Sequence, residues 1–236
     1  MRIIAGMAAA VVTTTLLVAP QSAHAAKVTK PKVTAECKAA SADRTVPLSG
    51  AKFGRCVLGG TFSSKTFTVK TKTSSFTEKT TYKHGKSMSL DSSVFGMRIV
   101  IIGKKTYLRP DKKSPWIQGK AKGNADQREV HGMGVEIRRT AKRSSQQAVY
   151  RWGSDWNFTG KTKTVKGVKQ WQYVGAPELT SVFGEVDAVT NTVWVDKYFR
   201  PITDVLRITL DGESETIRST YSGYGKKVTI TAPKVK

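Results

Sequence analysis

The sequence has few residues of the kinds that build metal centres and nucleophilic active sites. Its 236 residues include two cysteines and three histidines, and His84 and His131 lie far from each other and from both cysteines along the chain. A zinc site needs several Cys or His ligands at short spacings, and a Ser-His-Asp site needs a histidine beside its nucleophile. The G-x-S-x-G elbow, the P-loop and the dinucleotide fingerprint are missing as well. We therefore expect no metal, no cofactor and no enzyme activity.

Acidic residues are scarce. Lys and Arg number 40 against 17 Asp and Glu, which gives a formal net charge of +23. The acids Asp211, Glu213 and Glu215 gather on an expected hairpin, where a solvated edge is favoured over a glycosidase pair. The basic excess is concentrated in residues 51–125, which hold 16 Lys and Arg against three acids.

A net charge of this size indicates which partners the protein can bind, and it does not indicate the fold. It favours an anionic cell-wall polymer, an anionic membrane surface or an acidic protein as partner, although solvated strand faces are the simpler explanation. The candidate residues for such contacts are Lys104, Lys105, Lys112 and Lys113. Aromatic residues interleaved for base stacking are absent, so we expect no nucleic acid partner, and we expect a monomer.

Long apolar runs are absent after the first 25 residues. Arg2, the apolar run over 3–18 and the Ala23-His24-Ala25 cleavage pattern predict a signal peptide over 1–25 and a secreted, extracellular protein. In that compartment Cys37 and Cys56 are expected to form a disulfide, which contributes about 3 kcal/mol in the chain-entropy model. A metal site or a reactive thiol is the weaker alternative, because no histidine stands at a suitable spacing.

The chain after residue 25 is expected to contain two parts. Residues 26–59 form a basic tail and the cysteine-containing segment, in which we identify no amphipathic helix. Residues 60–236 form one β-rich domain, which is long enough to bury a core.

The last third of the chain carries the strongest strand signals. Strands are expected over 192–195, 205–210, 215–221 and 228–231, and Asp211-Gly212 predicts a tight hairpin between the second and the third. Leu206, Ile208 and Leu210 alternate with Val205, Arg207 and Thr209, which is typical of a strand with one buried face.

Earlier segments add further strands. The pattern predicts them over 61–73, 76–82, 87–95, 97–102, 105–109, 116–117, 156–164 and 169–174. Asn124 with Gln127 resembles a capping box for a short helix that Gly132 and Gly134 would end, and a second helix is expected from Thr140 or Ser144 to Tyr150. A third is expected over 176–183, with a proline in its first turn.

Four of these segments, in this order, resemble the LolA/LppX-type carrier fold. They are MRIVIIGKKTYLR at 97–109, VKGVKQWQYVG at 165–175, VWVDKYFRPI at 193–202 and YSGYGKKVTITAP at 221–233. The resemblance covers roughly residues 60–233. It implies a mostly β, α+β fold: an open antiparallel half-barrel of about 8–11 strands, with short helices over its concave face. Members of that family bind lipids or acylated proteins in an apolar cavity between sheet and helices, although this chain lacks their lipid-modified N-terminal cysteine.

Two functions follow from these patterns. The first is a secreted, non-enzymatic protein that holds a lipid or another apolar ligand, such as an acylated molecule, between sheet and helices. Its expected cavity residues, which in an ordinary domain would only fill the core, are Phe67, Val69, Met97, Ile99, Ile101, Tyr107, Trp171, Trp194, Leu206, Ile208 and Ile230. The alternative is a basic interaction or inhibitor protein that binds an anionic polymer or an acidic protein through its surface.

Overall fold

Eleven strands form one sheet in the structure, a computed structural model that describes residues 31, 33–151, 153–177 and 186–235. The signal peptide expected over 1–25 and most of the helix expected over 176–183 lie outside the described residues. The strands are β1 (Thr66–Lys72), β2 (Thr77–Lys83), β3 (Ser89–Val94), β4 (Met97–Ile102), β5 (Lys105–Arg109), β6 (Ile117–Gln118), β7 (Asn157–Val165), β8 (Val168–Gly175), β9 (Ala188–Val195), β10 (Pro201–Leu210) and β11 (Glu213–Ser222).

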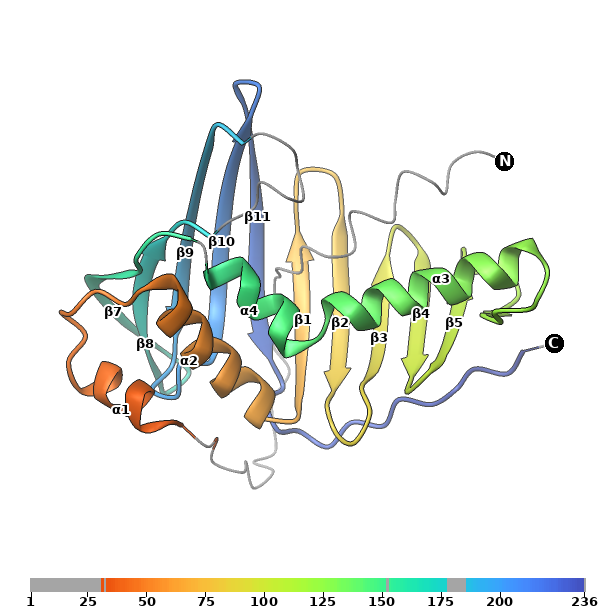
Figure 1. Cartoon of the computed structure of the whole chain (residues 1–236), viewed down its shortest axis with the longest axis horizontal. Helices are drawn as coiled ribbons and strands as arrows, with labels where there is room; N and C mark the ends of the chain where they lie inside the picture. Colours follow the sequence, from red (N-terminus) through yellow and green to blue (C-terminus); the bar gives the residue numbers. More distant parts are fainter. Residues whose placement is uncertain (1–30, 32, 152, 178–185, 236) are drawn as a thin grey trace.

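Neighbouring strands run antiparallel in the order β6-β5-β4-β3-β2-β1-β11-β10-β9-β8-β7. The first and last strands of the sequence therefore lie side by side in the middle of the sheet, and its edges are β6 and β7. The sheet stays open rather than closing into a barrel (Figure 1), so the predicted open half-barrel is confirmed.

The tight turns follow from the sequence. Asp211 and Gly212 have φ angles of 49° and 77°, and Lys166 and Gly167 have φ angles of 50° and 75°. Positive φ at both central residues defines the type I′ turn, whose twist matches that of a hairpin. The hairpin predicted at Asp211-Gly212 is thus confirmed, and Lys166-Gly167 forms a second turn of the same type.

Four helices accompany the sheet in the described part of the chain: α1 (Ala35–Ala42), α2 (Gly50–Ser63), α3 (Ala125–Thr140) and α4 (Arg143–Arg151). Figure 1 shows α2, α3 and α4 across one face of the sheet, which we call the inner face, and we call the opposite face the outer face. Side chains alternate between the two faces, so that on β1 Val69 and Thr71 point inward while Lys70 and Lys72 point outward.

The segment before residue 60 contains two helices, which corrects the expectation that it has no amphipathic helix. α2 buries Phe53, Cys56 and Val57 against the sheet residues Tyr173 and Val193. The expected boundary between residues 59 and 60 falls inside this helix. The four glycines of α2 interrupt its apolar stripe, so the sequence alone does not show the periodicity of an amphipathic helix.

α3 begins as predicted and ends later than predicted. The Asn124 side chain accepts a hydrogen bond from the Gln127 amide, and the Gln127 side chain accepts one from the Asn124 amide, which completes the capping box. The helix then continues through both glycines to Thr140. Gly134 is buried where the helix touches β5, so contact with the sheet outweighs its poor helix propensity.

The last predicted strand, over 228–231, does not form. Residues 226–235 have no regular secondary structure, although the Thr66 hydroxyl donates a hydrogen bond to the Lys226 carbonyl at the start of this segment. β11 already has β1 and β10 as partners, so no sheet edge lies beside it to pair with a further strand. Ile230 therefore lies outside the sheet.

Candidate ligand-binding face

A row of buried polar side chains crosses the inner face in the middle of the sheet. Glu78 of β2 lies opposite Thr71 of β1, Thr71 lies opposite Ser219 of β11, and Ser219 lies opposite Asp204 of β10. All four residues are at most 3% exposed. We call these four residues the polar row. Because neighbouring strands stand about 4.8 Å apart, the row extends roughly 14 Å across the sheet.

The carboxyl group of Glu78 is bound by hydroxyls at one end of the row. The Thr80 hydroxyl donates to its Oε1 atom at 2.5 Å and the Ser92 hydroxyl donates at 2.8 Å. Burial raises the pKa of Glu78, and these two hydrogen bonds lower it by less. The net effect favours the protonated, uncharged acid.

Asp204 is the carboxyl group at the other end. Burial raises its pKa from 3.8 to about 7, and the hydrogen bond from the Asn191 side chain opposes this shift. The charge of Asp204 also raises the pKa of Tyr150 on α4 and of Tyr221 on β11, for which burial is the larger cause. Asp204 is thus placed beneath a helix and beside phenol groups, where it can carry a proton near neutral pH.

Several polar atoms of this region have no hydrogen-bond partner among the described residues. They are Thr71 Oγ1, Ser219 Oγ, Asp204 Oδ1 and Asn191 Oδ1. An unsatisfied buried polar group costs about 1–3 kcal/mol, and native cores contain few of them. Three of these atoms belong to the row and the fourth, Asn191 Oδ1, lies on the same face, so the row has unused capacity to donate to and accept from a polar group.

Apolar clusters lie on both sides of the polar row. The α3 cluster includes Phe67, Ile99 and Ile101 with Val130 and Ile137 of α3. The second, which we call the β10 cluster, is built of Leu206, Ile208 and Ile217. Thr71 stands two residues after Val69 on β1, and Asp204 stands two residues before Leu206 on β10, so the row separates the clusters. The polar row thus lies between two buried apolar clusters, and an amphipathic molecule likewise joins a polar group to an apolar part.

A third apolar cluster, which we call the α2 cluster, packs α2 against the inner face of β8 and β9. The Phe53 ring of α2 stacks on Trp156 with ring centres 4.1 Å apart, and both side chains are fully buried. The cluster also contains Tyr173, Val193 and Phe199. Aromatic side chains packed this closely are typical of an ordinary core rather than of a binding surface.

Most of the predicted cavity residues lie on the inner face. The α3 cluster contains Phe67, Val69, Ile99 and Ile101, and Met97 packs against it. Leu206 and Ile208 belong to the β10 cluster, and Trp171 packs against the α2 cluster. The structure therefore distributes these residues among three clusters instead of gathering them into one.

Trp194 and Tyr107 lie on the outer face, so their predicted place in the cavity is wrong. Trp194 alternates with the buried Val193 and Val195, and the Lys163 ammonium stands 4.0 Å from the centre of its ring. Tyr107 pairs across the sheet with Val100, while its neighbour Leu108 pairs with Ile99 of the inner face. The alternation predicted two faces correctly, but we placed the larger aromatic side chains inward.

The four predicted surface lysines are exposed and do not form one patch. Lys104 lies in the turn before β5 and Lys105 is the first residue of that strand, whereas Lys112 and Lys113 lie in the loop after it. A five-residue strand separates the two pairs by about 17 Å.

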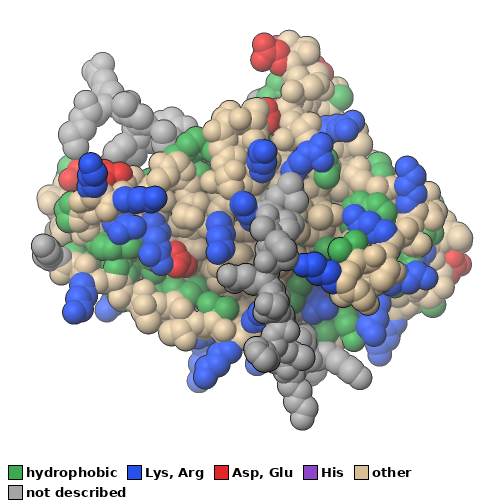
Figure 2. Space-filling view, turned by 180° about the vertical axis from the view of Figure 1, so that it is seen from behind, with side chains coloured by type: hydrophobic (Ala, Val, Ile, Leu, Met, Phe, Trp, Pro, Cys, Tyr) green, Lys and Arg blue, Asp and Glu red, His purple; other side chains and the backbone are tan. Residues whose placement is uncertain are grey.

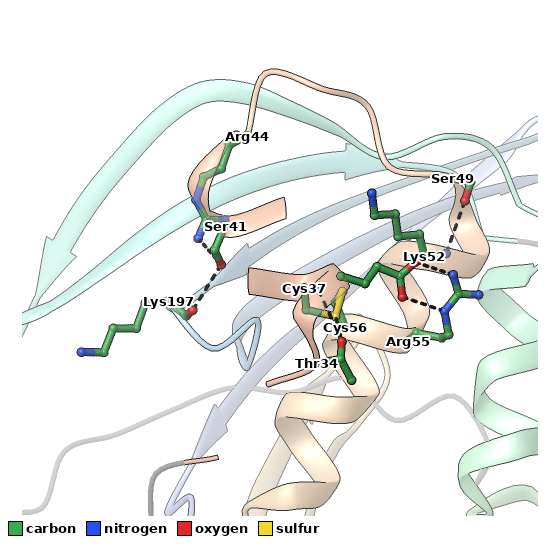
Figure 3. The surroundings of a disulfide bond; sticks show 10 residues. Thr34, Cys37, Ser41, Arg44, Ser49, Lys52, Arg55, Cys56 and Lys197 are labelled. Atoms are coloured by element: carbon green, nitrogen blue, oxygen red, sulfur yellow. Dashed lines mark hydrogen bonds and ion pairs between the residues drawn. A yellow bond between two sulfur atoms is a disulfide. The ribbon is translucent and has the colours of Figure 1, made fainter. Parts of the chain in front are cut away.

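The predicted disulfide is present and joins α1 to α2 through Cys37 and Cys56 (Figure 3). Beside it, Arg55 binds Glu36 through two hydrogen bonds, which lower the pKa of that exposed carboxyl group. Arg44, in the segment after α1, donates to the Tyr173 hydroxyl and covers the Trp171 ring at 4.1 Å. The disulfide thus fixes α1, and Arg44 in the segment after α1 orients Trp171.

No protein-family model matches this sequence, and no curated protein matches it. Solved protein structures do match it, among them the crystal structures of LprF and LppX. LprF from Mycobacterium bovis matches with a TM-score of 0.53 and 13% identity, over 78% of this chain and 96% of that one. The lipoprotein LppX from Mycobacterium tuberculosis matches with a TM-score of 0.51 and 13% identity, over 77% and 98%. This chain has a LolA/LppX-type fold.

In this LolA/LppX-type fold, sequence reasoning missed the polar row. One signal was available, because Asp204 stands in register with Leu206 and Ile208 on the apolar face of a well-predicted strand. Thr71 and Ser219 gave no local signal, since their burial depends on a pairing between the first and last strands. Among the described residues no group of three or more His, Cys, Asp or Glu could hold a metal ion, and no helix is long and apolar enough to span a membrane.

Proposed function

We propose that this protein is a secreted, non-enzymatic binding protein that holds a lipid or an acylated molecule on the inner face of its sheet. The observation that carries the proposal is the polar row, which lies between two apolar clusters and in which Thr71 Oγ1, Ser219 Oγ and Asp204 Oδ1 have no hydrogen-bond partner in the part of the chain that the structure describes. An amphipathic ligand would place its polar group on the row and its apolar chain along one of the clusters. The LolA/LppX-type fold and the apolar start of the chain support this function and its extracellular site.

The first experiment is native mass spectrometry of the protein purified from its own secreting cells, followed by lipid extraction. We expect a bound species that organic solvent releases. A protein of bare mass that also binds no fatty acid, acyl peptide or hydrophobic dye in vitro would overturn the proposal.

The second experiment removes two hydroxyls from the row and otherwise changes the side chains as little as possible. In a fluorescent fatty-acid binding assay, Thr71→Val combined with Ser219→Ala should weaken binding about tenfold, since each lost hydrogen bond contributes roughly 0.5–1.5 kcal/mol. The same variant should be at least as stable as the parent without ligand, because two unsatisfied hydroxyls leave the core.

Thr216→Val provides the matched control. Thr216 lies on β11, as Ser219 does, but its side chain belongs to the outer face and should leave affinity unchanged. Equal affinities in all three proteins would show that the row does not contact the fatty acid.

A further inference from the structure

Cations face one another directly across neighbouring strands on the outer face. Lys70 of β1 lies opposite Lys79 of β2, and Lys72 of β1 lies opposite Arg218 of β11. Two strands beyond β2, Arg98 of β4 lies opposite Arg109 of β5. Side chains in such positions have Cβ atoms about 5 Å apart, and like charges there repel each other and destabilise the sheet.

These pairs form a continuous arrangement. Ser93 of β3 lies opposite both Lys79 and Arg98, so Lys70, Lys79, Ser93, Arg98 and Arg109 follow one line across five strands. Lys72 and Arg218 stand beside its β1 end, two residues along the strand. We call the six cations the basic row. Strand spacing gives the line a length of about 19 Å.

Acids do little to neutralise these charges. Asp91 binds Arg98 through two hydrogen bonds, and Arg109 helps to lower the pKa of Asp111, for which hydrogen bonds are the larger cause; no ion pair is seen for Lys70, Lys72, Lys79 or Arg218 among the described residues. Figure 2, seen from the side opposite the helices, shows many Lys and Arg side chains and few Asp and Glu. The Trp116 ring lies 5.8 Å from the Arg98 guanidinium and 5.2 Å from that of Arg109, which fixes this end of the row.

We propose that the basic row is a binding site for a linear polyanion, with a phosphate chain as the partner whose chemistry fits best. Repulsion between opposed cations is relieved when anionic groups bind between them, and guanidinium groups bind phosphate oxygens in pairs. The row is narrow and crosses five strands from β1 to β5, which suits an extended chain of regularly spaced charges. The outer face of a half-barrel is convex, so a flat membrane would touch only part of the row. This site is separate from the inner face and goes beyond the function proposed above.

The test uses long-chain inorganic polyphosphate as the probe and isothermal titration calorimetry as the measurement. The row variant carries Lys70→Gln, Lys72→Gln, Lys79→Gln and Arg218→Gln. We expect it to bind polyphosphate at least about tenfold more weakly than the parent and with a smaller salt dependence, because fewer counterions are released. Its thermal unfolding temperature should equal or exceed that of the parent, since two repulsive pairs are gone.

The control variant carries Lys104→Gln, Lys105→Gln, Lys112→Gln and Lys113→Gln. It loses the same charge from exposed positions at the two ends of β5, and its affinity should fall less than about threefold, as expected for screened charges outside the site. Equal losses in the two variants would show that only net charge matters, and the proposal would be rejected.

Two further probes distinguish other partners. Anionic phospholipid vesicles and oligothymidylate are titrated at the same total charge and salt concentration. Weaker binding of both probes supports the proposal. Tighter binding of the vesicles would indicate a membrane surface, and tighter binding of oligothymidylate would indicate a nucleic acid site, so either result overturns it. A parent protein that binds no polyphosphate at low salt overturns it as well.

Discussion

Gly134 of α3 lies so close to Thr106 of β5 that a Cβ atom on the glycine would overlap the threonine side chain. Gly132, on the exposed side of the same helix, has nothing within 4 Å of that position. The Thr106 hydroxyl also accepts a hydrogen bond from Arg138 at 2.9 Å. Close approach at Gly134 thus sets the distance between the helix and the sheet.

These two glycines give a matched pair of substitutions. Gly134→Ala should lower the free energy of unfolding by about 1–3 kcal/mol, because Thr106 must move and its hydrogen bond to Arg138 is disturbed. Gly132→Ala should raise it by up to about 1 kcal/mol, because alanine is the better helix former. Chemical denaturation of both variants measures the difference, and a Gly134→Ala protein as stable as the parent would contradict the close packing.

Asp204 makes stability depend on pH. Its pKa is about 7 in the folded protein against an ordinary 3.8, so the folded state holds the proton more tightly. This contribution to stability is fully present below about pH 4, decreases as pH rises towards 7 and is lost above it, at a total of about 4 kcal/mol. Asp204→Asn should therefore be more stable than the parent at pH 8 and gain little at pH 4.

Denaturation of both proteins at several pH values measures this difference. The raised pKa of Glu78 acts in the same direction and cancels when variant and parent are compared. A difference between the two proteins that does not change from pH 4 to pH 8 would mean that Asp204 does not titrate in this range.

His84 has the opposite effect. Its ring packs between Phe62 and Phe67, and burial lowers its pKa from 6.5 to about 4. The folded state therefore holds the proton less tightly, and stability is lost as pH falls from about 6.5 to 4, by about 3 kcal/mol. His84→Phe should remove this acid-induced loss. If the variant and the parent lose stability equally on acidification, the histidine is not the cause.

The disulfide links α1 to the core through a short loop. Replacing Cys37 and Cys56 with alanine should lower the free energy of unfolding by about 3 kcal/mol in the chain-entropy model. Intact mass should be about 2 Da below the value for free thiols, and thiol labelling of the protein purified without reductant should find none. Two reactive thiols in protein purified without reductant would be incompatible with this bond.

The sequence predicted those elements whose signals are local. The alternation of Leu206 and Ile208, the Asp211-Gly212 turn and the Asn124 capping box each depend on a few adjacent residues, and all three are confirmed. Predictions from local sequence signals were wrong where contacts with residues distant in the sequence determine the structure. The sequence pattern predicts a helix end at Gly134, whereas packing against β5 allows the helix to continue. Residues 228–231 have the pattern of a strand, but the sheet has no free edge beside them.

The candidate site was only partly predictable for the same reason. Apolar residues such as Ile99 and Leu206 could be assigned to a buried face from their alternation. The polar row could not be recognised, because Thr71, Ser219 and Asp204 become neighbours only through the pairing of β1 with β11 and β11 with β10. The basic row depends on the same register, which brings Lys72 opposite Arg218.

The pairing of β1 with β11 also determines when the chain can finish folding. The strands before β7 form one meander and β7 to β11 form another, and each has an open edge until Glu213–Ser222 is in place. A chain that ends before residue 213 would leave one edge of β1 and one edge of β10 unpaired, and exposed edges of this kind promote aggregation. Folding of the whole sheet therefore waits for one of the last segments to be synthesised, which keeps the contact order high and the rate of folding low.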